Sequence, residues 1–535
     1  MPFVSVSSAL VELSTATHPD KVRDPDARAA LLRVVAGCRR SLRGDLWPRP
    51  WQIVGAAYAA LSADRCLIAD DQGLGKTGIA LLRVLLGNHP LVVVVTTASM
   101  FGTWSREAGD WLPGCPVHSL GSEAAPLPPP GWRGIVIVSW ALLGAHADGL
   151  ARIAPSMVIA DEAHYATNPE AARSQSLADL VDAVPHVLLL TGTPINNKAA
   201  ELWALLWMLD SHAWPSPEPF DALDPAEIAE IAGVDPEGAV AKAVAAALPV
   251  AAPPTVSEGF KRKLAQFMLR RLKGDTIPRS ELPDKEYRTI LVNLSPEQRA
   301  EYDYVEQNFE EWLEAALRAK ERAGLALGKG GDNRSVEERV DAAMKAEYLA
   351  KMGHLRAIVG RAKGRAAIEW IARKVEDREP VVVFGEHRAV LDAIGEGLTA
   401  RGIAFGQLVG KIDKKIRSET VKAFQGGRLG VILASHAGKE GVTLTRARHA
   451  LFVQWWWTSA AQDQGADRIH RIGQTRQTTI WRMTAVDTID TRLGKISERK
   501  RGLVESVIGN ALVRVVGQTE TGGNRPTRAR VAPSR

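Results

Sequence analysis

The chain has 535 residues, which is too long for one ordinary hydrophobic core, so we expect two large domains with insertions. Hydrophobic residues make up 46% and charged residues 24% of the sequence, close to the averages of folded proteins. No apolar run reaches the roughly 18 residues that a membrane helix needs, which excludes a spanning segment. The formal net charge of +6 is small for this length.

The positive charge is concentrated at one end of the chain. From Glu498 to Arg535 there are eight Arg and Lys residues against three Glu residues. We expect residues 512–535 to form a basic, disordered tail that contacts the phosphates of nucleic acid. A solvated tail without a partner remains open, because this segment has too few apolar residues to fold.

The cysteines and the first residues bear on the compartment. Cys38, Cys66 and Cys115 are too scattered for a zinc site or a disulfide framework. The first twenty residues lack a basic start followed by a long apolar block, which argues against export. We therefore expect a cytoplasmic protein associated with the nucleoid, and the richness in Ala, Arg, Gly and Trp favours a bacterial or phage source.

Two sets of short apolar runs predict the fold class. The first set consists of "CLIA", "LVVVVTT", "GIVIVSW", "MVIADE" and "VLLLTGT", between about residues 65 and 210. The second begins at "PVVVFGE" and continues with "GIAFGQLVG", "LGVILASH", "HALFVQWW" and "TTIWRMTAV". Runs that are apolar throughout are typical of strands buried on both faces of a parallel sheet covered by helices. The sequence thus predicts two α/β domains in tandem.

Composition changes mark the boundaries of the expected parts. A Pro- and Ala-rich stretch follows the first domain, and a charged stretch with helical periodicity precedes the second. In chain order we expect an N-terminal extension (1–45), a first α/β domain (46–210), an insert that returns to the core (211–296), a helical insertion (297–375), a second α/β domain (376–511) and the basic tail (512–535).

The stretch "ADDQGLGKTGIALL", residues 69–82, follows the first apolar run and predicts a phosphate-binding loop. Gly73 and Gly75 leave room for a phosphate to approach the backbone, and Lys76 and Thr77 begin the next helix. The lysine would neutralise phosphate charge, and the hydroxyl of Thr77 would bind magnesium. The strict pattern requires glycine where this chain has Asp70, so an ordinary glycine-rich turn stays open.

Two adjacent carboxylates follow the apolar run "MVIA". Asp161 and Glu162 stand at the expected carboxyl end of a strand, where open parallel sheets bind their ligands. One carboxylate can hold magnesium while the other orients and deprotonates an attacking water. Together with the loop, this pair predicts ATP hydrolysis with Mg²⁺.

The order of the motifs carries a family resemblance. "DDQGLGKT", "DEAH" and "LTGTP" resemble motifs I, II and III of superfamily 2 helicase-like ATPases. "FMLRRLKGDTIPRSELPDK", "ASHAGKEGVTLT" and "QGADRIHRIGQ" resemble the SWI/SNF-type DNA translocases, and "VVFGEHRAVLDAI" is most similar to the HepA-related annealing-helicase branch. The resemblance covers about residues 46–510. It implies two RecA-like parallel-sheet domains in tandem with helical insertions.

The resemblance also implies roles for single residues. Gln52 would read adenine, Asp71 in the phosphate loop would help to bind the nucleotide, and Arg468 and Arg471 would be the arginine fingers. Because these arginines stand three apart, we expect them on one face of a helix, although a solvated surface pair stays open. Coupling roles are implied for His164, Thr191, Thr193 and Gln464. DNA contacts are implied for Thr97, Ser139 and Thr443.

One motif departs from the family pattern. The family usually has Trp-Asn-Pro before motif VI, whereas this chain has Trp457-Thr458-Ser459. The preceding aromatic run "QWWW" (454–457) could stack on bases, and burial at a strand end is the favoured alternative.

These features predict a monomeric, ATP-dependent DNA translocase. Its two lobes would close on ATP and move along duplex or forked DNA through phosphate contacts, with little sequence preference, remodelling or annealing DNA structures. A strand-separating helicase, a remodeller that displaces proteins from DNA and a non-hydrolysing ATP-binding scaffold remain alternatives.

Overall fold

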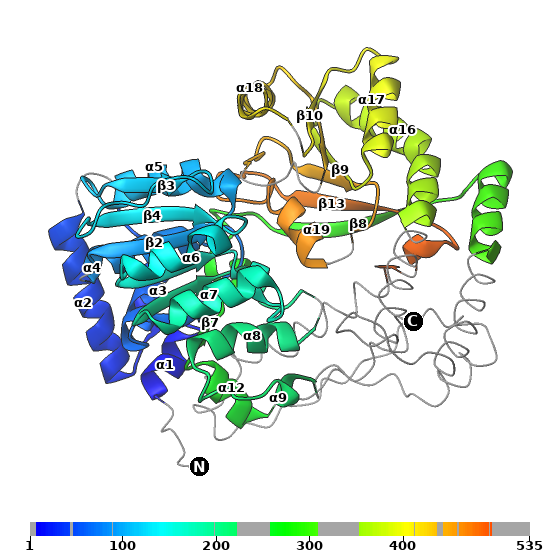
Figure 1. Cartoon of the computed structure of the whole chain (residues 1–535). Coiled ribbons are helices and arrows are strands. Elements are labelled where there is room, and N and C mark those ends of the chain that lie inside the picture. The colour runs from blue at the N-terminus through cyan, green and yellow to red at the C-terminus, as the bar shows by residue number, and fades with distance from the viewer. Residues whose placement is uncertain are drawn as a thin grey trace, which may run out of the picture. The chain divides into compact units, whose positions relative to one another are not determined.

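A computed structural model describes most of the chain as two compact units, one ending at Thr276 and the other beginning at Ile277 (Figure 1). The described residues are 7–42, 46–87, 89–196, 198–221, 257–308, 353–410, 412–435, 442–456, 459–491 and 493–494. The predicted tail 512–535, the central part of the predicted insert (222–256) and a large part of the predicted helical insertion (309–352) lie outside them.

The first unit is built on a seven-stranded sheet with the order β3-β4-β2-β5-β6-β1-β7. All its neighbouring strands pair in parallel. The strands are β1 (Arg65–Ile68), β2 (Leu91–Thr96), β3 (Val117–Leu120), β4 (Gly134–Ser139), β5 (Met157–Asp161), β6 (His186–Leu190) and β7 (Met268–Leu269).

Alternate side chains of these strands enter two apolar cores, one on each face of the sheet. One core includes Val93 and Val158 and is covered by α6 (Leu143–Arg152), α7 (Ala172–Asp182) and α8 (Ala200–Leu209). The other includes Val94 and Ile159. It is covered by α1 (Ser8–Leu13), α2 (Pro25–Ser41), α3 (Pro50–Leu61), α4 (Lys76–Leu86) and α5 (Phe101–Trp111).

Short elements complete the first unit. They are the 3-10 turns η1 (Pro19–Lys21), η2 (Ala98–Met100) and η3 (Ala163–Ala166), and the helices α9 (Glu218–Asp221), α12 (Glu258–Leu264) and α13 (Lys273–Thr276). Helices α1 and α2 lie in the predicted extension 1–45 and pack into the second core described above.

The second unit contains a six-stranded sheet with the order β10-β11-β9-β12-β13-β8, again paired in parallel. Its strands are β8 (Lys285–Val292), β9 (Val381–Gly385), β10 (Phe405–Leu408), β11 (Val431–Ser435), β12 (His449–Phe452) and β13 (Thr478–Ala485). One face is covered by α16 (Gly364–Glu376) and α17 (Arg388–Thr399). The other face is covered by α18 (Lys414–Gln425) and α19 (Ser459–Ala466).

The predicted fold class is confirmed: two parallel-sheet domains follow each other, and each apolar run named above contains a strand. The sequence did not predict β3, β7 or β8. Strand β8 lies within the range 211–296 but belongs to the second unit, so the exact domain boundaries stay a prediction. In the part of the chain that the structure describes, no helix is long and apolar enough to cross a membrane.

Candidate functional site

The phosphate loop connects β1 to α4 and has the backbone that a phosphate cradle needs. Gly73 and Gly75 have φ angles of 89° and 76°, in the left-handed region that favours glycine. Gly75 caps the N-terminus of α4, whose free N–H groups and dipole attract anions. The two predicted glycines are thus required by the backbone itself.

Lys76 is the first residue of α4, and its ammonium points back into the loop. Nζ donates hydrogen bonds to the carbonyl oxygens of Asp70, at 2.7 Å, and Asp71, at 3.3 Å. Burial lowers the pKa of Lys76, although the nearby carboxylates of Glu162, Asp70 and Asp161 act in the opposite direction. The loop therefore fixes the position of its cation before any anion binds.

Asp161 ends β5 and its carboxylate is buried. Oδ2 accepts hydrogen bonds from Thr96 Oγ1 at 3.0 Å and from Trp104 Nε1 at 2.8 Å, and Oδ1 accepts one from the N–H of Glu162. Burial and the neighbouring Glu162 raise the pKa of Asp161 to about 6, against the effect of the two side-chain donors. The carboxylate is held in one orientation by donors from β2 and α5.

Glu162 adopts a left-handed backbone conformation with φ of 52°, which is strained for a residue with a side chain. Its Oε2 lies 3.2 Å from Nδ1 of His164. The same histidine nitrogen lies 3.2 Å from the hydroxyl of Thr191 and 3.5 Å from that of Thr193. A chain of polar contacts thus joins the carboxylate after β5 to the segment after β6, where coupling residues were predicted.

Gln52 and Asp71 lie at the phosphate loop, but their side chains bond to protein groups. The amide of Gln52 donates to the carbonyl of Gly75 at 3.1 Å and accepts from the N–H of Arg49 at 2.8 Å. The carboxylate of Asp71 pairs with Arg270 at 2.9 Å. The reading of adenine by Gln52 stays a prediction that requires this amide to turn towards a base.

The helical placement predicted for the two arginines is wrong, because α19 ends at Ala466 and both residues follow it in consecutive turns. Arg468 is buried, and its carbonyl accepts from the N–H of Leu444. Arg471 is half-buried and donates to the hydroxyl of Thr443 at 3.2 Å. Gln474 holds this turn by donating to the carbonyls of residues 445, 447 and 469.

The other predicted residues are placed as follows. Gln464 is half-buried within α19, and no role for it is tested. Thr97 and Ser139 stand at the carboxyl ends of the adjacent strands β2 and β4. The hydroxyl of Thr97 bonds to that of Ser99, and Ser139 is buried. Thr443 is exposed, and its hydroxyl accepts the hydrogen bond from Arg471. Their DNA contacts stay predictions.

The aromatic run 454–457 follows β12. Trp455 and Trp456 are buried; the indole of Trp455 donates to Thr484, and Trp456 packs edge-on against Phe384. These two rings offer no face to a base, in agreement with burial at a strand end. The chain departs from the family pattern at positions 458 and 459; residues 457 and 458 lie outside the described part, and Ser459 begins α19.

Sequence reasoning missed the residues that hold the site in place. Thr96 and Trp104 bind the carboxylate of Asp161, and Arg270 and Arg271 bind the two aspartates of the phosphate loop. The two arginines lie in the motif "FMLRRLKGD". The family resemblance included this segment but assigned no role to its arginines. No signal of spacing marked Trp104, because only the fold brings α5 to the end of β5.

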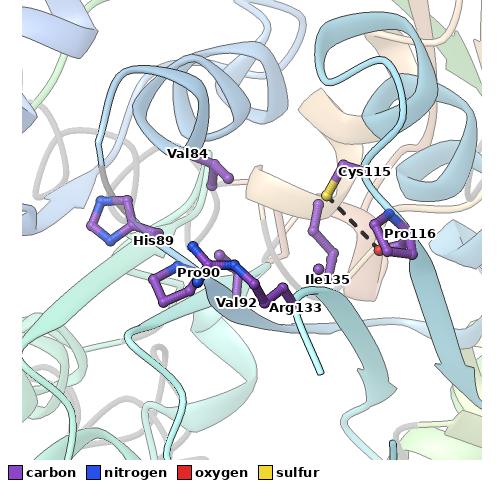
Figure 2. A pocket seen from close by; sticks show the side chains of 9 residues that line it. Val84, His89, Pro90, Val92, Cys115, Pro116, Arg133 and Ile135 are labelled. Atoms are coloured by element: carbon purple, nitrogen blue, oxygen red, sulfur yellow. Dashed lines mark hydrogen bonds between the residues drawn. The ribbon is translucent and has the colours of Figure 1, made fainter. Parts of the chain in front are cut away.

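A pocket of about 200 Å³ lies elsewhere in the first unit. Its lining includes His89 and Pro90 before β2, Cys115 and Pro116 before β3, and Arg133 before β4 (Figure 2). These residues precede their strands, whereas the predicted site residues follow theirs. The pocket is therefore at the opposite edge of the sheet from the phosphate loop, and it contains none of the predicted residues.

The fold and these motifs define a two-domain nucleotide-binding chain of the helicase-like class. The model of the SNF2-related domain matches residues 31–359, and that of the helicase conserved C-terminal domain matches residues 362–473. The chain therefore belongs to the SNF2-related family, which confirms the resemblance seen in the motifs.

Two relatives illustrate the similarity. The chain is 27% identical over 463 residues to the SWI/SNF-related matrix-associated actin-dependent regulator of chromatin subfamily A-like protein 1 of Xenopus tropicalis, covering 84% of this chain and 44% of that protein. It is 26% identical over 484 residues to the DNA annealing helicase and endonuclease ZRANB3 of Mus musculus, covering 86% and 40%. The chain thus spans less than half the length of either relative.

A solved structure also aligns with the chain. It is the Sulfolobus solfataricus SWI2/SNF2 ATPase core in complex with dsDNA, with 22% identity, a TM-score of 0.39, and coverage of 90% of this chain and 97% of that chain.

Proposed function

We propose that this chain is a DNA-dependent ATPase that couples ATP hydrolysis to movement along duplex or forked DNA. The observation that carries the proposal is the polar chain at one edge of the first sheet. There the phosphate loop with Lys76, the carboxylates of Asp161 and Glu162, and His164 with Thr191 lie at the ends of neighbouring strands. Membership of the SNF2-related family supports the same activity.

Each residue has a distinct task in this proposal. The N-terminus of α4 and Lys76 bind the phosphates of ATP, and Glu162 orients the attacking water and accepts its proton. His164 passes the state of Glu162 to Thr191 and Thr193 through the contacts described above. Arg468 and Arg471 neutralise the charge that develops on the phosphate oxygens during transfer.

Magnesium fits the donors of the first unit. A small divalent cation prefers oxygen ligands, and Asp161 supplies a carboxylate whose orientation is fixed by Thr96 and Trp104. Thr77 supplies a hydroxyl in the first turn of α4. When bound there, the ion would neutralise phosphate charge and orient the γ-phosphate. Asp161 and Thr77 would hold it.

DNA is the proposed partner, tracked through its phosphates with little sequence preference. The test is the ATPase rate measured side by side with single-stranded DNA, duplex DNA, forked DNA and RNA. We expect duplex or forked DNA to stimulate hydrolysis most, and triplex-strand displacement to report movement. Efficient separation of a long blunt duplex would favour the strand-separating helicase instead, and an ATPase that ignores every nucleic acid would refute the proposal.

A further inference from the structure

The start of the phosphate loop is paired with the end of β7 and the residues that follow it. Strand β7 lies beside β1, with Met268 opposite Leu67 and Leu269 opposite Ile68. The pairing continues past the ends of both strands, because the N–H of Ala69 donates to the carbonyl of Leu269 and the N–H of Asp71 donates to that of Arg271. Residues 269–271 therefore form a backbone support for the start of the loop.

Arg271 adds a buried ion pair to this support. Its guanidinium pairs through Nε and Nη2 with the two carboxylate oxygens of Asp70, and the exposed fractions of the two side chains are 1% and 0%. Nη1 also donates to the carbonyls of Trp51, at 2.6 Å, and Ala16, at 3.2 Å. Asp70 occupies the position where the strict loop pattern has glycine. Its buried carboxylate is paired with Arg271, so the acidic side chain has a structural partner.

Arg270 makes the corresponding contacts with the next residue of the loop. Nη2 pairs with Asp71 Oδ1 at 2.9 Å, and Nη1 donates to the carbonyls of Ala69 and Gly192. The N–H of Lys273 donates to the other carboxylate oxygen of Asp71 at 2.9 Å. One guanidinium thus connects the phosphate loop to the "LTGTP" segment after β6.

These contacts converge on Lys76. Its ammonium is held by the carbonyl oxygens of Asp70 and Asp71, the same two residues whose carboxylates the arginines hold. A buried ion pair contributes little net stability, because the cost of desolvation opposes the attraction of the charges. A bidentate pair nevertheless fixes the relative position of its two side chains closely. The arginines are therefore suited to set the position of Lys76.

We infer that Arg270 and Arg271 are positioning residues of the nucleotide site. By holding Asp70 and Asp71 they fix the phosphate loop and Lys76 in the place that nucleotide phosphates require. The inference rests on the proposed function, because it assumes that the loop binds ATP. It goes beyond that function because it assigns a role to the residues that follow β7 and to Asp70, which stands in the glycine position of the strict loop pattern.

The test uses Arg270, which lies nearer to the surface than Arg271 and is the safer residue to change. The dissociation constant of Mg-ADP, measured by calorimetry on the full chain, should rise about tenfold or more in Arg270→Met. Arg270→Lys keeps the charge but cannot bridge the three acceptors. Its dissociation constant for Mg-ADP should lie between those of Arg270→Met and the unchanged protein. Because Arg270 acts through Asp71, the two substitutions should not add. The double variant Arg270→Met with Asp71→Asn should bind Mg-ADP no more weakly than the weaker-binding of the two single variants.

The matched control is Arg83→Met. Arg83 lies on α4, the helix that begins at the loop, and pairs through two bonds of 2.6 and 2.8 Å with Asp64 just before β1. This variant should lower thermal stability but leave the Mg-ADP affinity within about twofold of the unchanged protein. If Arg270→Met binds Mg-ADP as the unchanged protein does, the inference is wrong and the proposed function stands. If the unchanged protein fails to bind Mg-ADP, both are wrong.

Discussion

The phosphate loop of the first unit and the arginine-bearing turn of the second are supported by opposite ends of one stretch of chain, residues 267–285. At its beginning, Arg270 and Arg271 pair with the aspartates of the loop. At its end, Lys285 pairs with Asp467 at 3.2 Å, just before Arg468, and the carbonyl of Pro283 bonds to the ring of His470 at 2.8 Å. This stretch thus contacts the phosphate loop in the first unit and the arginine-bearing turn in the second.

The two supports differ in strength. The Arg271 pair has two bonds and is buried, whereas Lys285 makes a single bond and its side chain is 22% exposed. Burial lowers the pKa of Lys285, but Asp467, Tyr287 and Asp463 outweigh this effect and raise it. This stretch of chain thus holds the phosphate loop through a buried two-bond ion pair, and the turn that carries the arginines through a partly exposed one-bond ion pair. We therefore expect changes in the first unit to affect binding or chemistry outright, and changes in the second to affect turnover alone.

The largest effect should come from Glu162→Gln. The amide keeps the shape of the strained residue but cannot accept the proton of water, so turnover should fall by up to about 10⁴-fold while ATP still binds. Single-turnover hydrolysis and nucleotide binding, measured on the same preparation, separate the two effects. Lys76→Ala is the contrasting variant, because removing phosphate charge should weaken binding itself. Normal hydrolysis by Glu162→Gln would contradict the assignment of the site.

The next effect in size belongs to the second unit. Arg471→Ala should lower kcat by about 10³-fold, within the range that an arginine finger supplies, with little change in Mg-ADP affinity. The matched control is Arg476→Ala, which removes an arginine five residues further on that pairs with Glu379 at 3.1 Å. A fall of less than about threefold in kcat for Arg471→Ala would show that this turn does not act in hydrolysis.

The sequence predicted those parts of the fold whose signal is local. Runs such as "LVVVVTT" are apolar because both faces of β2 are buried, and their short length and β-branched residues distinguish them from helices. Strand β8 escaped prediction because it is half-exposed along "KEYRTILV", and β7 because two residues carry no periodicity. Each joins its sheet through tertiary pairing, which a local pattern does not report.

The candidate site divides in the same way. Lys76, Asp161 and Glu162 were predicted because their motifs are contiguous in sequence and stand at strand ends. Trp104 and Arg271 were not, since their partners lie 57 and 201 residues away and only the fold brings them together. The helical placement of Arg468 failed because a spacing of three is equally compatible with consecutive turns.

A smaller effect should come from Lys285→Met, which tests the lighter support. Losing the bond to Asp467 should loosen the turn before Arg468 and lower kcat by about tenfold, the order expected for one charged hydrogen bond. The Mg-ADP affinity should not change, because Asp467 and Tyr287, which Lys285 contacts, belong to the second unit. Arg288→Met is the control on the same strand, where an exposed arginine pairs with Glu286. Equal kcat in both variants would show that Lys285 does not support the turn in hydrolysis.

The last expected effect concerns stability rather than turnover, and it comes from a buried histidine in the second sheet. His449 begins β12, and its Nδ1 accepts a hydrogen bond from the indole of Trp481 at 3.2 Å, so the ring is neutral. Burial lowers the pKa of His449 to about 4, and the nearby Lys374 and Arg448 add to the effect while Glu379 opposes it. Protonation would remove the acceptor and place a charge inside the protein.

In the unfolded chain the ring of His449 titrates near its ordinary value of about 6.5. Between about pH 6.5 and pH 4 the unfolded state binds more protons, so the free energy of unfolding should fall as the pH falls through this window, by about 2 kcal/mol between pH 7 and pH 5. Hydrogen exchange of β12 and β13 measures this loss within the second unit. His449→Gln, which offers an acceptor that does not titrate, should flatten the dependence, whereas His354→Gln, at an exposed position, should not. An equal loss of protection in the unchanged protein and in His449→Gln would assign the acid sensitivity to groups other than His449.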